Sequence, residues 1–438
     1  MNNHITLKAL TERERLGGLF IGLLAYLIIY YSQIGSRIPA LGAVRLEFIV
    51  GAVVCSLMCF KVAASSESFS ENTLNVLCLT FLGVVALGVP FALVRAVALD
   101  SFIIFAKSLL IYFMIVAAVD SEKKLRMFLY VYIIMSSLLF VEPFLFSLQG
   151  LGFRYNNGMM RLYGVAGFFA HPNSLGAITS SIFPFLYALM HSERSPIRRF
   201  LIFLLFPIGL RVIMLTQSRT AFVGVMVFVA LLWLHHERKL LSSVMLLVFL
   251  SAAFLLAPSQ TITRFATLSN MSSMLEFSDP LDTTMVSEYG SMGSRWRLLL
   301  RSLHVFMEHP VFGVGIGNYV VESLRVFGAW TPTHNLYTEI LAELGIIGFV
   351  LFISIIVLTF RNLRTAKKQL LKIEPEESFK QQIIWAVWAF LVMRLVVGFF
   401  GHDLLNNYWW VGGGLSVVLL RLAKEGHAAL PDSIAKQG

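Results

Sequence analysis

One polar stretch of an otherwise apolar sequence, at about 291–348, contains residue types that handle a charged substrate. Its distinctive residues are three closely spaced arginines, a Gly-x-Gly-x-Gly turn and one histidine: Arg295, Arg297, Arg301, Gly313, Gly315, Gly317 and His334. Guanidinium groups bind phosphates, backbone at glycine can approach a ligand closely, and a neutral imidazole can accept a proton. The stretch therefore predicts a site that binds an anion and deprotonates a second group.

His334 lies between Thr333 and Asn335, where an apolar helical run begins. A lone histidine at such a position is typical of a structural cap or hydrogen-bonding group. Beside several arginines at a membrane face, a general base is the preferred interpretation, because nearby cations lower the imidazole pKa and keep the ring neutral. We expect His334 to take a proton from a hydroxyl.

Arg295 follows Gly293 and Ser294, and the apolar spacing after it predicts a helix. We expect Ser294 to cap this helix and Arg295 to begin it, where free backbone N–H groups favour a phosphate or another anion. Arg297 and Arg301 are four residues apart, so a stripe facing solvent or lipid headgroups is the alternative interpretation for these two.

The glycine turn does not match a nucleotide-binding loop. A P-loop needs Lys-Ser/Thr after its last glycine, and no strand pattern precedes Gly313. A tight turn against a neighbouring segment or ligand is the better interpretation. The sequence also contains no HExxH motif, no clustered aspartates and no Gly-x-Ser-x-Gly motif. We therefore expect no metal, no cofactor and no serine nucleophile.

The composition determines where such a site must be placed. Hydrophobic residues make up 57% of the chain and charged residues 14%, whereas soluble domains are about one quarter charged. Apolar runs of roughly 18 to 22 residues predict an all-α polytopic membrane protein, because a span in lipid must satisfy its own backbone hydrogen bonds. The net charge of +10 is then explained by basic loops at the membrane rather than by nucleic acid.

We predict about twelve membrane spans. They lie at about 17–35, 42–62, 74–94, 98–119, 125–146, 173–191, 199–216, 219–234, 240–257, 338–360, 383–401 and 404–422. Roughly twice as many Lys and Arg residues fall on the side of the termini as on the other side, so the positive-inside rule places both termini in the cytoplasm.

Two loops on the outer side are long enough to contribute to a site. The smaller, at about 147–172, contains Arg154, Arg161 and His171, and we expect His171 to join the site or to fix the loop before the next span. The larger, at 258–337, is partly helical. The chain is therefore divided into spans one to nine (1–257), the large outer loop (258–337), and spans ten to twelve with a cytoplasmic tail (338–438).

Several ionisable residues fall in or near predicted spans, where a charge costs about 3 kcal/mol at the bilayer centre. They are Arg45, Glu47, Asp100, Lys107, Glu142, Arg211 and Arg394. Internal ion pairs or side chains reaching the headgroups would explain most of them. Arg211 is the best site candidate, because eight residues separate it from Arg219 and would keep both on one helix face. For Arg219, at the outer surface, headgroup anchoring is the alternative.

Five segments in the centre of the chain resemble the O-antigen ligase family, part of a superfamily that also contains O-antigen polymerases and bacterial protein O-oligosaccharyltransferases. They are AHPNSLG (170–176), QSRTAF (217–222), GSRWRL (293–298), HPVFGVGIGNY (309–319) and THNLYTEILAELGIIG (333–348). Each segment is a weak signal by itself. Their order and the position of the long loop are those of the family.

The resemblance implies a metal-independent, inverting glycosyltransferase with a GT-C-like architecture, in the bacterial inner membrane, with a periplasmic active site. The implied donor is a glycan on undecaprenyl diphosphate, the acceptor is a sugar hydroxyl of lipid A–core, and membrane lipids surround a monomer. By this resemblance Arg219 and Arg295 would hold the donor diphosphate, and His334 would deprotonate the acceptor. Secondary candidates are Arg211, Arg297, Arg301, Arg154, Arg161 and His171.

Two alternatives remain open. A polymerase or a protein-glycosylating enzyme of the same superfamily would use the same donor with another acceptor, and the sequence does not separate these functions. A transporter of lipid-linked sugars would also have many spans. A transporter predicts repeated halves with a site near the membrane midplane, however, and the sequence shows no such repeat.

Overall fold

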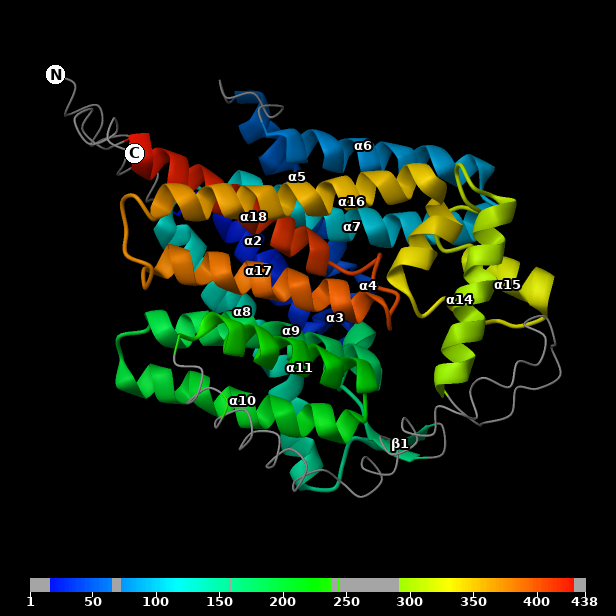
Figure 1. Cartoon of the computed structure of the whole chain (residues 1–438), viewed down its shortest axis with the longest axis horizontal. Coiled ribbons are helices and arrows are strands. Elements are labelled where there is room, and N and C mark those ends of the chain that lie inside the picture. The colour runs from blue at the N-terminus through cyan, green and yellow to red at the C-terminus, as the bar shows by residue number, and fades with distance from the viewer. Residues whose placement is uncertain (1–15, 65–71, 157–158, 238–242, 244–290, 429–438) are drawn as a thin grey trace.

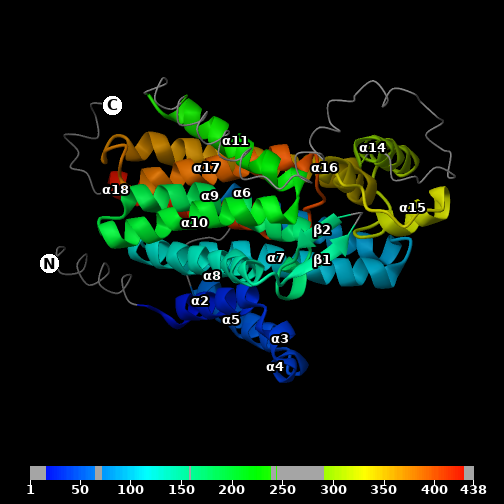
Figure 2. The ribbon, with the colours of Figure 1, turned by 90° about the horizontal axis from the view of Figure 1, so that it is seen from below.

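The computed structural model describes residues 16–64, 72–156, 159–237, 243 and 291–428 (Figure 1). Long helices run side by side in a bundle, and a short hairpin and two further helices lie at one end (Figures 1 and 2). The helices are α2 (Gly18–Ser32), α3 (Ile34–Arg37), α4 (Pro39–Ala43), α5 (Leu46–Ala64), α6 (Thr73–Gly88), α7 (Arg95–Ala118), α8 (Glu122–Leu148), α9 (Pro172–Ser192), α10 (Pro196–Thr216), α11 (Arg219–His235), α14 (Ser291–Glu308), α15 (Tyr319–Phe327), α16 (Leu336–Leu370), α17 (Phe379–Gly398) and α18 (Tyr408–Ala428). The strands are β1 (Phe153–Asn156) and β2 (Met159–Leu162), and the short 3-10 helices are η2 (Val89–Phe91) and η3 (Gly167–Ala170).

Eight of the described helices are long and apolar enough to cross a membrane, namely α5, α6, α7, α8, α9, α10, α16 and α17. Helices α2 and α11 are also apolar but shorter. The predicted fold class, a helical protein with several membrane-spanning helices, is therefore confirmed. The number of twelve spans stays a prediction. The helices found at the spans expected at 17–35, 219–234 and 404–422 are not among these eight, and the span expected at 240–257 lies outside the described residues.

The loop predicted at 147–172 contains a hairpin, which an all-α description does not include. Strands β1 and β2 pair antiparallel, with Phe153 opposite Leu162 and Arg154 opposite Arg161. Each strand has only four residues, which is too short for a clear alternating pattern.

Helix α9 lies in the middle of the bundle and packs on α10, α11 and α17 (Figure 1). Small residues permit this close packing, as they do between membrane helices generally. A Cβ added at Gly176 would lie 2.7 Å from the Ala221 Cβ, and one added at Gly224 would lie 3.3 Å from the Ser180 Oγ. The start of α9 is therefore held against the turn between α10 and α11.

The chain direction brings several helix ends to the right-hand end of the bundle in Figure 1. Helix α9 starts there after His171, α10 ends there at Thr216, and α11 starts there at Arg219. Helix α16 also starts there, after His334, and the loop at 399–407 joins α17 to α18 at the same end. The residues singled out from the sequence thus belong to one end of the molecule.

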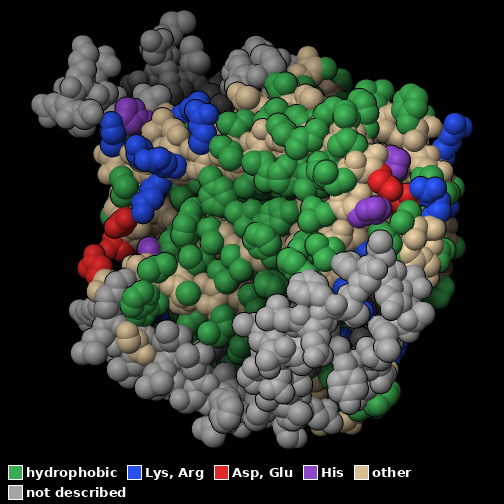
Figure 3. All heavy atoms as spheres, turned by 45° about the vertical axis from the view of Figure 1, so that its right-hand side comes forward, with side chains coloured by type: hydrophobic (Ala, Val, Ile, Leu, Met, Phe, Trp, Pro, Cys, Tyr) green, Lys and Arg blue, Asp and Glu red, His purple; other side chains and the backbone are tan. Residues whose placement is uncertain are grey.

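Between its two ends the molecule exposes an apolar surface. Hydrophobic side chains fill the middle of the face in Figure 3, and charged side chains gather toward its two sides. On α16, the side chains of Ile346, Val350 and Val357 are exposed. Such a band is the surface that a lipid bilayer would cover.

Candidate active site

His334 lies in the segment before α16, and the next residue, Asn335, is the N-cap of that helix. The His334 backbone has a left-handed φ of 51°, which is uncommon for a residue with a side chain. Asn335 caps α16, because its Oδ1 accepts the N–H groups of Tyr337 (2.9 Å) and Thr338 (3.1 Å). The Asn335 amide also donates to the Phe399 carbonyl oxygen at 3.4 Å. The capping role therefore belongs to Asn335, and the His334 ring is available for another one.

A second histidine lies against His334. His402 belongs to the loop at 399–407, and the two imidazole ring centroids are 5.2 Å apart with the ring planes at 62°. The His402 side chain is exposed, whereas His334 is half-buried. Asp403, the next residue, forms an ion pair with the buried Arg394 of α17. The loop that carries His402 is thereby fixed to the bundle.

Arg295 reaches the same loop from α14. Its Cζ lies 5.9 Å from the centroid of the Phe400 ring, and its charge acts on His334. Because α14 begins at Ser291, the expectation that Arg295 begins the helix behind a Ser294 cap is wrong. The helix starts one turn earlier than predicted. Arg295 therefore contributes its side-chain charge, and the free N–H groups of the helix start lie elsewhere.

Arg219 is the first residue of α11 and is half-buried. Ser218 caps this helix, with its Oγ accepting the Ala221 N–H at 3.4 Å. The Thr220 hydroxyl donates to the Phe400 carbonyl oxygen at 3.4 Å, so the first turn of α11 contacts the same loop as Arg295 and Asn335. A helix start has N–H groups without helical partners, and these favour an anion.

The structure corrects the placement of Arg211. Helix α10 ends at Thr216, and Gln217 has a left-handed φ of 52°. The chain therefore reverses between Arg211 and Arg219, which lie on separate helices, and the expected shared helix face is wrong. Arg211 is exposed near the outer end of α10.

Burial and neighbouring charge keep His334 neutral. Burial has the largest effect and His402, Arg295 and His171 add to it, so that the pKa of His334 falls to about 4. Protein around His402 also lowers the pKa of that ring, with a contribution from His171. The pKa of His171 is lowered by burial and by Arg161. The expected lowering of the His334 pKa is thus confirmed, and all three imidazoles are neutral at pH 7.

The hairpin and the start of α9 support the site from one side. His171 caps α9, with its Nδ1 accepting the Asn173 N–H at 3.2 Å. The buried Arg161 donates from Nε to the Thr216 carbonyl oxygen at 2.8 Å and from Nη2 to the Asn173 Oδ1 at 2.6 Å. Arg161 therefore joins β2 to α9 and α10. His171 fixes the loop, as predicted, and lies close enough to affect His334.

The remaining secondary candidates lie against aromatic rings or along α14. The Arg154 Cζ is 5.1 Å from the centroid of the Tyr163 ring. The Arg301 Cζ is 5.0 Å from the centroid of the Phe327 ring, so Arg301 packs α14 against α15 rather than forming a solvated stripe. Arg297 is half-buried on α14.

The glycine turn packs on a kink in α16. Inside that helix Gly345 has the non-helical angles φ 65° and ψ −167°. Gly313 has a left-handed φ of 68°, and a Cβ added there would lie 2.3 Å from the Glu343 carbonyl carbon. The Glu343 carboxylate accepts the Gly317 N–H at 2.7 Å. The prediction of a tight turn against a neighbouring segment is confirmed, and glycine is required because a side chain would collide there.

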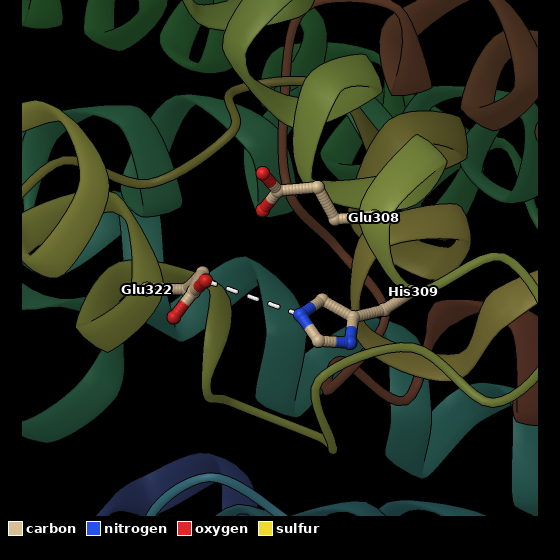
Figure 4. Close-up of side chains that lie close together, drawn as sticks. All are labelled: Glu308, His309 and Glu322. Atoms are coloured by element: carbon tan, nitrogen blue, oxygen red, sulfur yellow. Dashed lines mark ion pairs between the residues drawn. The ribbon is translucent and has the colours of Figure 1, made fainter.

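Glu308, His309 and Glu322 form a separate cluster at the other end of α14 (Figure 4). Their ligand atoms lie within 4.8 Å of one another, so the geometry alone would allow a cation. Arg325 donates to both carboxylate oxygens of the buried Glu322 and already balances its charge. About 20 Å of helix separates Glu308 from Arg295, at 1.5 Å per residue. The cluster therefore lies outside the candidate active site, and its members come from segments too far apart for a sequence motif.

His402 and Asp403 are not among the residues predicted from the sequence. Both immediately follow the span predicted at 383–401, on the side expected to carry the site. A His-Asp pair at that boundary was the available signal. Arg394 was recognised only as a charge within a span, and its pairing with Asp403 required the fold.

Comparison with known proteins adds to this geometry. Residues 200–353 match the model of a protein family described as O-antigen ligase. The match contains Arg219, Arg295 and His334, while the loop at 399–407 lies beyond it. No curated protein matches the chain.

Proposed function

We infer that this chain, whose residues 200–353 match the model of a family described as O-antigen ligase, is an O-antigen ligase that transfers a glycan from undecaprenyl diphosphate to a sugar hydroxyl of lipid A–core. The observation that supports this most is the position of His334, a half-buried neutral imidazole beside His402 and within the field of Arg295. The reaction needs a base for a hydroxyl and positive charge for a departing diphosphate.

The transfer is a single displacement. The acceptor oxygen attacks the anomeric carbon as His334 takes its proton, and the bond to the diphosphate oxygen breaks on the opposite face, which inverts the configuration. Negative charge grows on the diphosphate as this bond breaks. Arg219, Arg295 and the N–H groups at the start of α11 would stabilise that charge without a metal ion.

Donor binding strengthens the base in this proposal. A general base works best when its pKa is near the working pH, and a pKa of about 4 makes His334 a weak base in the free site. A diphosphate held by Arg295 and Arg219 adds negative charge near the imidazole, and negative charge raises a histidine pKa. His334 then becomes an efficient base only after the donor has bound.

The position of the site suits a lipid-linked donor. The helices that carry the arginines, α11 and α14, bring them to one end of the bundle (Figure 1), and an apolar surface lies between the two ends of the molecule (Figure 3). A prenyl chain would lie along this surface in the membrane, with its diphosphate at the bundle end. In the bacterial inner membrane, with both termini in the cytoplasm as the Lys and Arg distribution predicts, this end faces the periplasm.

A transfer assay with three acceptors tests the proposed reaction. Purified protein in lipid nanodiscs receives an undecaprenyl-diphosphate-linked glycan, EDTA, and either lipid A–core, a second donor molecule or a pilin-like peptide. A ligase produces glycosylated lipid A–core. Product on the second donor would instead identify a polymerase, and product on the peptide would identify a protein glycosyltransferase.

Variants test the assigned roles. His334→Ala should reduce transfer by about 10²–10⁴-fold, the usual contribution of general base catalysis. Arg219→Ala and Arg295→Ala should abolish donor use in a correctly folded protein. His304→Ala is the matched control, because His304 is an exposed α14 residue whose ring pairs with Glu308 at 3.3 Å. Full activity of His334→Ala would exclude this residue as the base.

A further inference from the structure

The candidate active site contains a second imidazole for which the proposed reaction gives no role. The ring of His402 lies edge-on to that of His334, with 5.2 Å between their centroids. His334 is half-buried, whereas His402 is exposed to solvent. His402 is therefore in contact both with His334 and with water, although the surrounding protein still desolvates its ring enough to lower its pKa.

The proton from the acceptor hydroxyl has to leave His334 after each transfer. Once the diphosphate product has left, protonated His334 is again disfavoured by burial and by the charge of Arg295, so the proton has to pass to a group that can accept it. The groups whose charge acts on His334 are His402, Arg295 and His171. The elements around it also carry Arg219 on α11, Glu339 on α16 and Asp403 in the loop.

Several of these groups are committed to other contacts. The arginines carry protons permanently. Asp403 is paired with Arg394. In the described part of the chain, the buried Glu339 accepts the Leu404 N–H through one carboxylate oxygen, while its Oε2 has no hydrogen-bond partner. His171 uses its Nδ1 to cap α9. His402 is the group in direct ring contact with His334.

We propose that His402 relays the reaction proton from His334 to solvent, directly or through one bridging water, and this inference rests on the proposed function. The acceptor O–H bond breaks as the proton joins a His334 ring nitrogen. The proton then passes to His402 and on to bulk water, which returns both imidazoles to the neutral state. No electrons are transferred, and the departing diphosphate keeps the electron pair of the bond to the sugar.

The loop holds His402 in the place that a relay requires. Thr220 donates to the Phe400 carbonyl oxygen and Asn335 donates to the Phe399 carbonyl oxygen, both at 3.4 Å. On the other side of His402, Asp403 is paired with the buried Arg394. The backbone on both sides is thus tied to α11, α16 and α17. These contacts anchor the backbone at His402 beside His334.

The test compares His402→Ala and His402→Gln with the wild-type protein at saturating donor and acceptor in weak buffer. We expect kcat to fall about tenfold in both variants while the donor KM stays within twofold, because water replaces the relay only in part. Added imidazole should restore most of the lost rate in His402→Ala, because a free imidazole can occupy the vacated space. His304→Ala, in the same assay, should behave as wild type with and without imidazole.

Each outcome bears on a defined claim. A kcat within twofold of wild type in both His402 variants overturns the relay, and so does a loss that imidazole fails to restore in a correctly folded variant. Loss of transfer in His334→Ala together with normal transfer in both His402 variants refutes the relay alone. Absence of transfer by wild type, or full transfer by His334→Ala, refutes the proposed function and the relay with it.

Discussion

Replacing Arg295 by glutamine should raise the pH at which His334 titrates, because a cation that disfavours the imidazolium is removed. The pKa of His334 is about 4, compared with about 6.5 for an unperturbed imidazole. This difference corresponds to about 3 kcal/mol. Burial contributes most to the lowering of the His334 pKa, His402 second and Arg295 third, so Arg295 accounts for at most one third of the lowering. The titration midpoint should therefore move upward by less than about one pH unit.

A histidine-selective NMR titration of the protein in nanodiscs measures this change. The His334 signal is identified by its loss in His334→Asn. Arg295→Lys is the matched variant, because it keeps the positive charge and should titrate close to wild type. A midpoint for Arg295→Gln at or below the wild-type midpoint would refute the reasoning, since it would show that the charge of Arg295 does not act on His334.

Three further predictions concern stability, measured as thermal unfolding in detergent. Asp403→Asn leaves the buried Arg394 without its countercharge and should destabilise the protein by about 3–5 kcal/mol; an unchanged melting temperature would contradict the role of this pair. Gly313→Ala should destabilise the protein by more than the roughly 1–3 kcal/mol typical of backbone strain, because the added Cβ would also collide with the Glu343 backbone. An unchanged melting temperature would mean that the turn can shift. Stability should fall as the pH is lowered from about 6.5 to about 4, because the unfolded chain protonates this histidine in that range and folded His334 stays neutral. His334→Asn should reduce this acid sensitivity. An equal dependence of melting temperature on pH in the two proteins would contradict the assigned pKa.

The helices of the bundle could be predicted from the sequence because their signals are local. The span expected at 173–191 corresponds to α9 (Pro172–Ser192), and that expected at 219–234 corresponds to α11 (Arg219–His235). Helix α16 extends to Leu370, ten residues beyond the expected end at 360. Hydropathy marks the part of a helix that lipid covers, whereas the polar residues after 360 continue the same helix beyond it.

The candidate site could be predicted only in part, because its completion depends on tertiary contacts. Residue type and the family resemblance were sufficient to select Arg219, Arg295 and His334. The approach of His402 depends on a loop fixed by contacts with three helices, which leaves no pattern in the sequence. The reversal that separates Arg211 from Arg219 occurs at Gln217, a residue type that does not indicate a left-handed turn.

The central claim is that His334 removes the acceptor proton once a diphosphate donor is bound. The most direct test is the single-turnover rate of glycan transfer to lipid A–core, measured with the undecaprenyl-diphosphate-linked donor already bound to the purified protein in EDTA. We predict transfer by the wild type, with the acid limb of its pH profile above the pKa of about 4 in the free site, and a rate about 10²–10⁴-fold lower in His334→Ala. Equal rates in the two proteins, or no transfer by correctly folded wild type, would contradict the account.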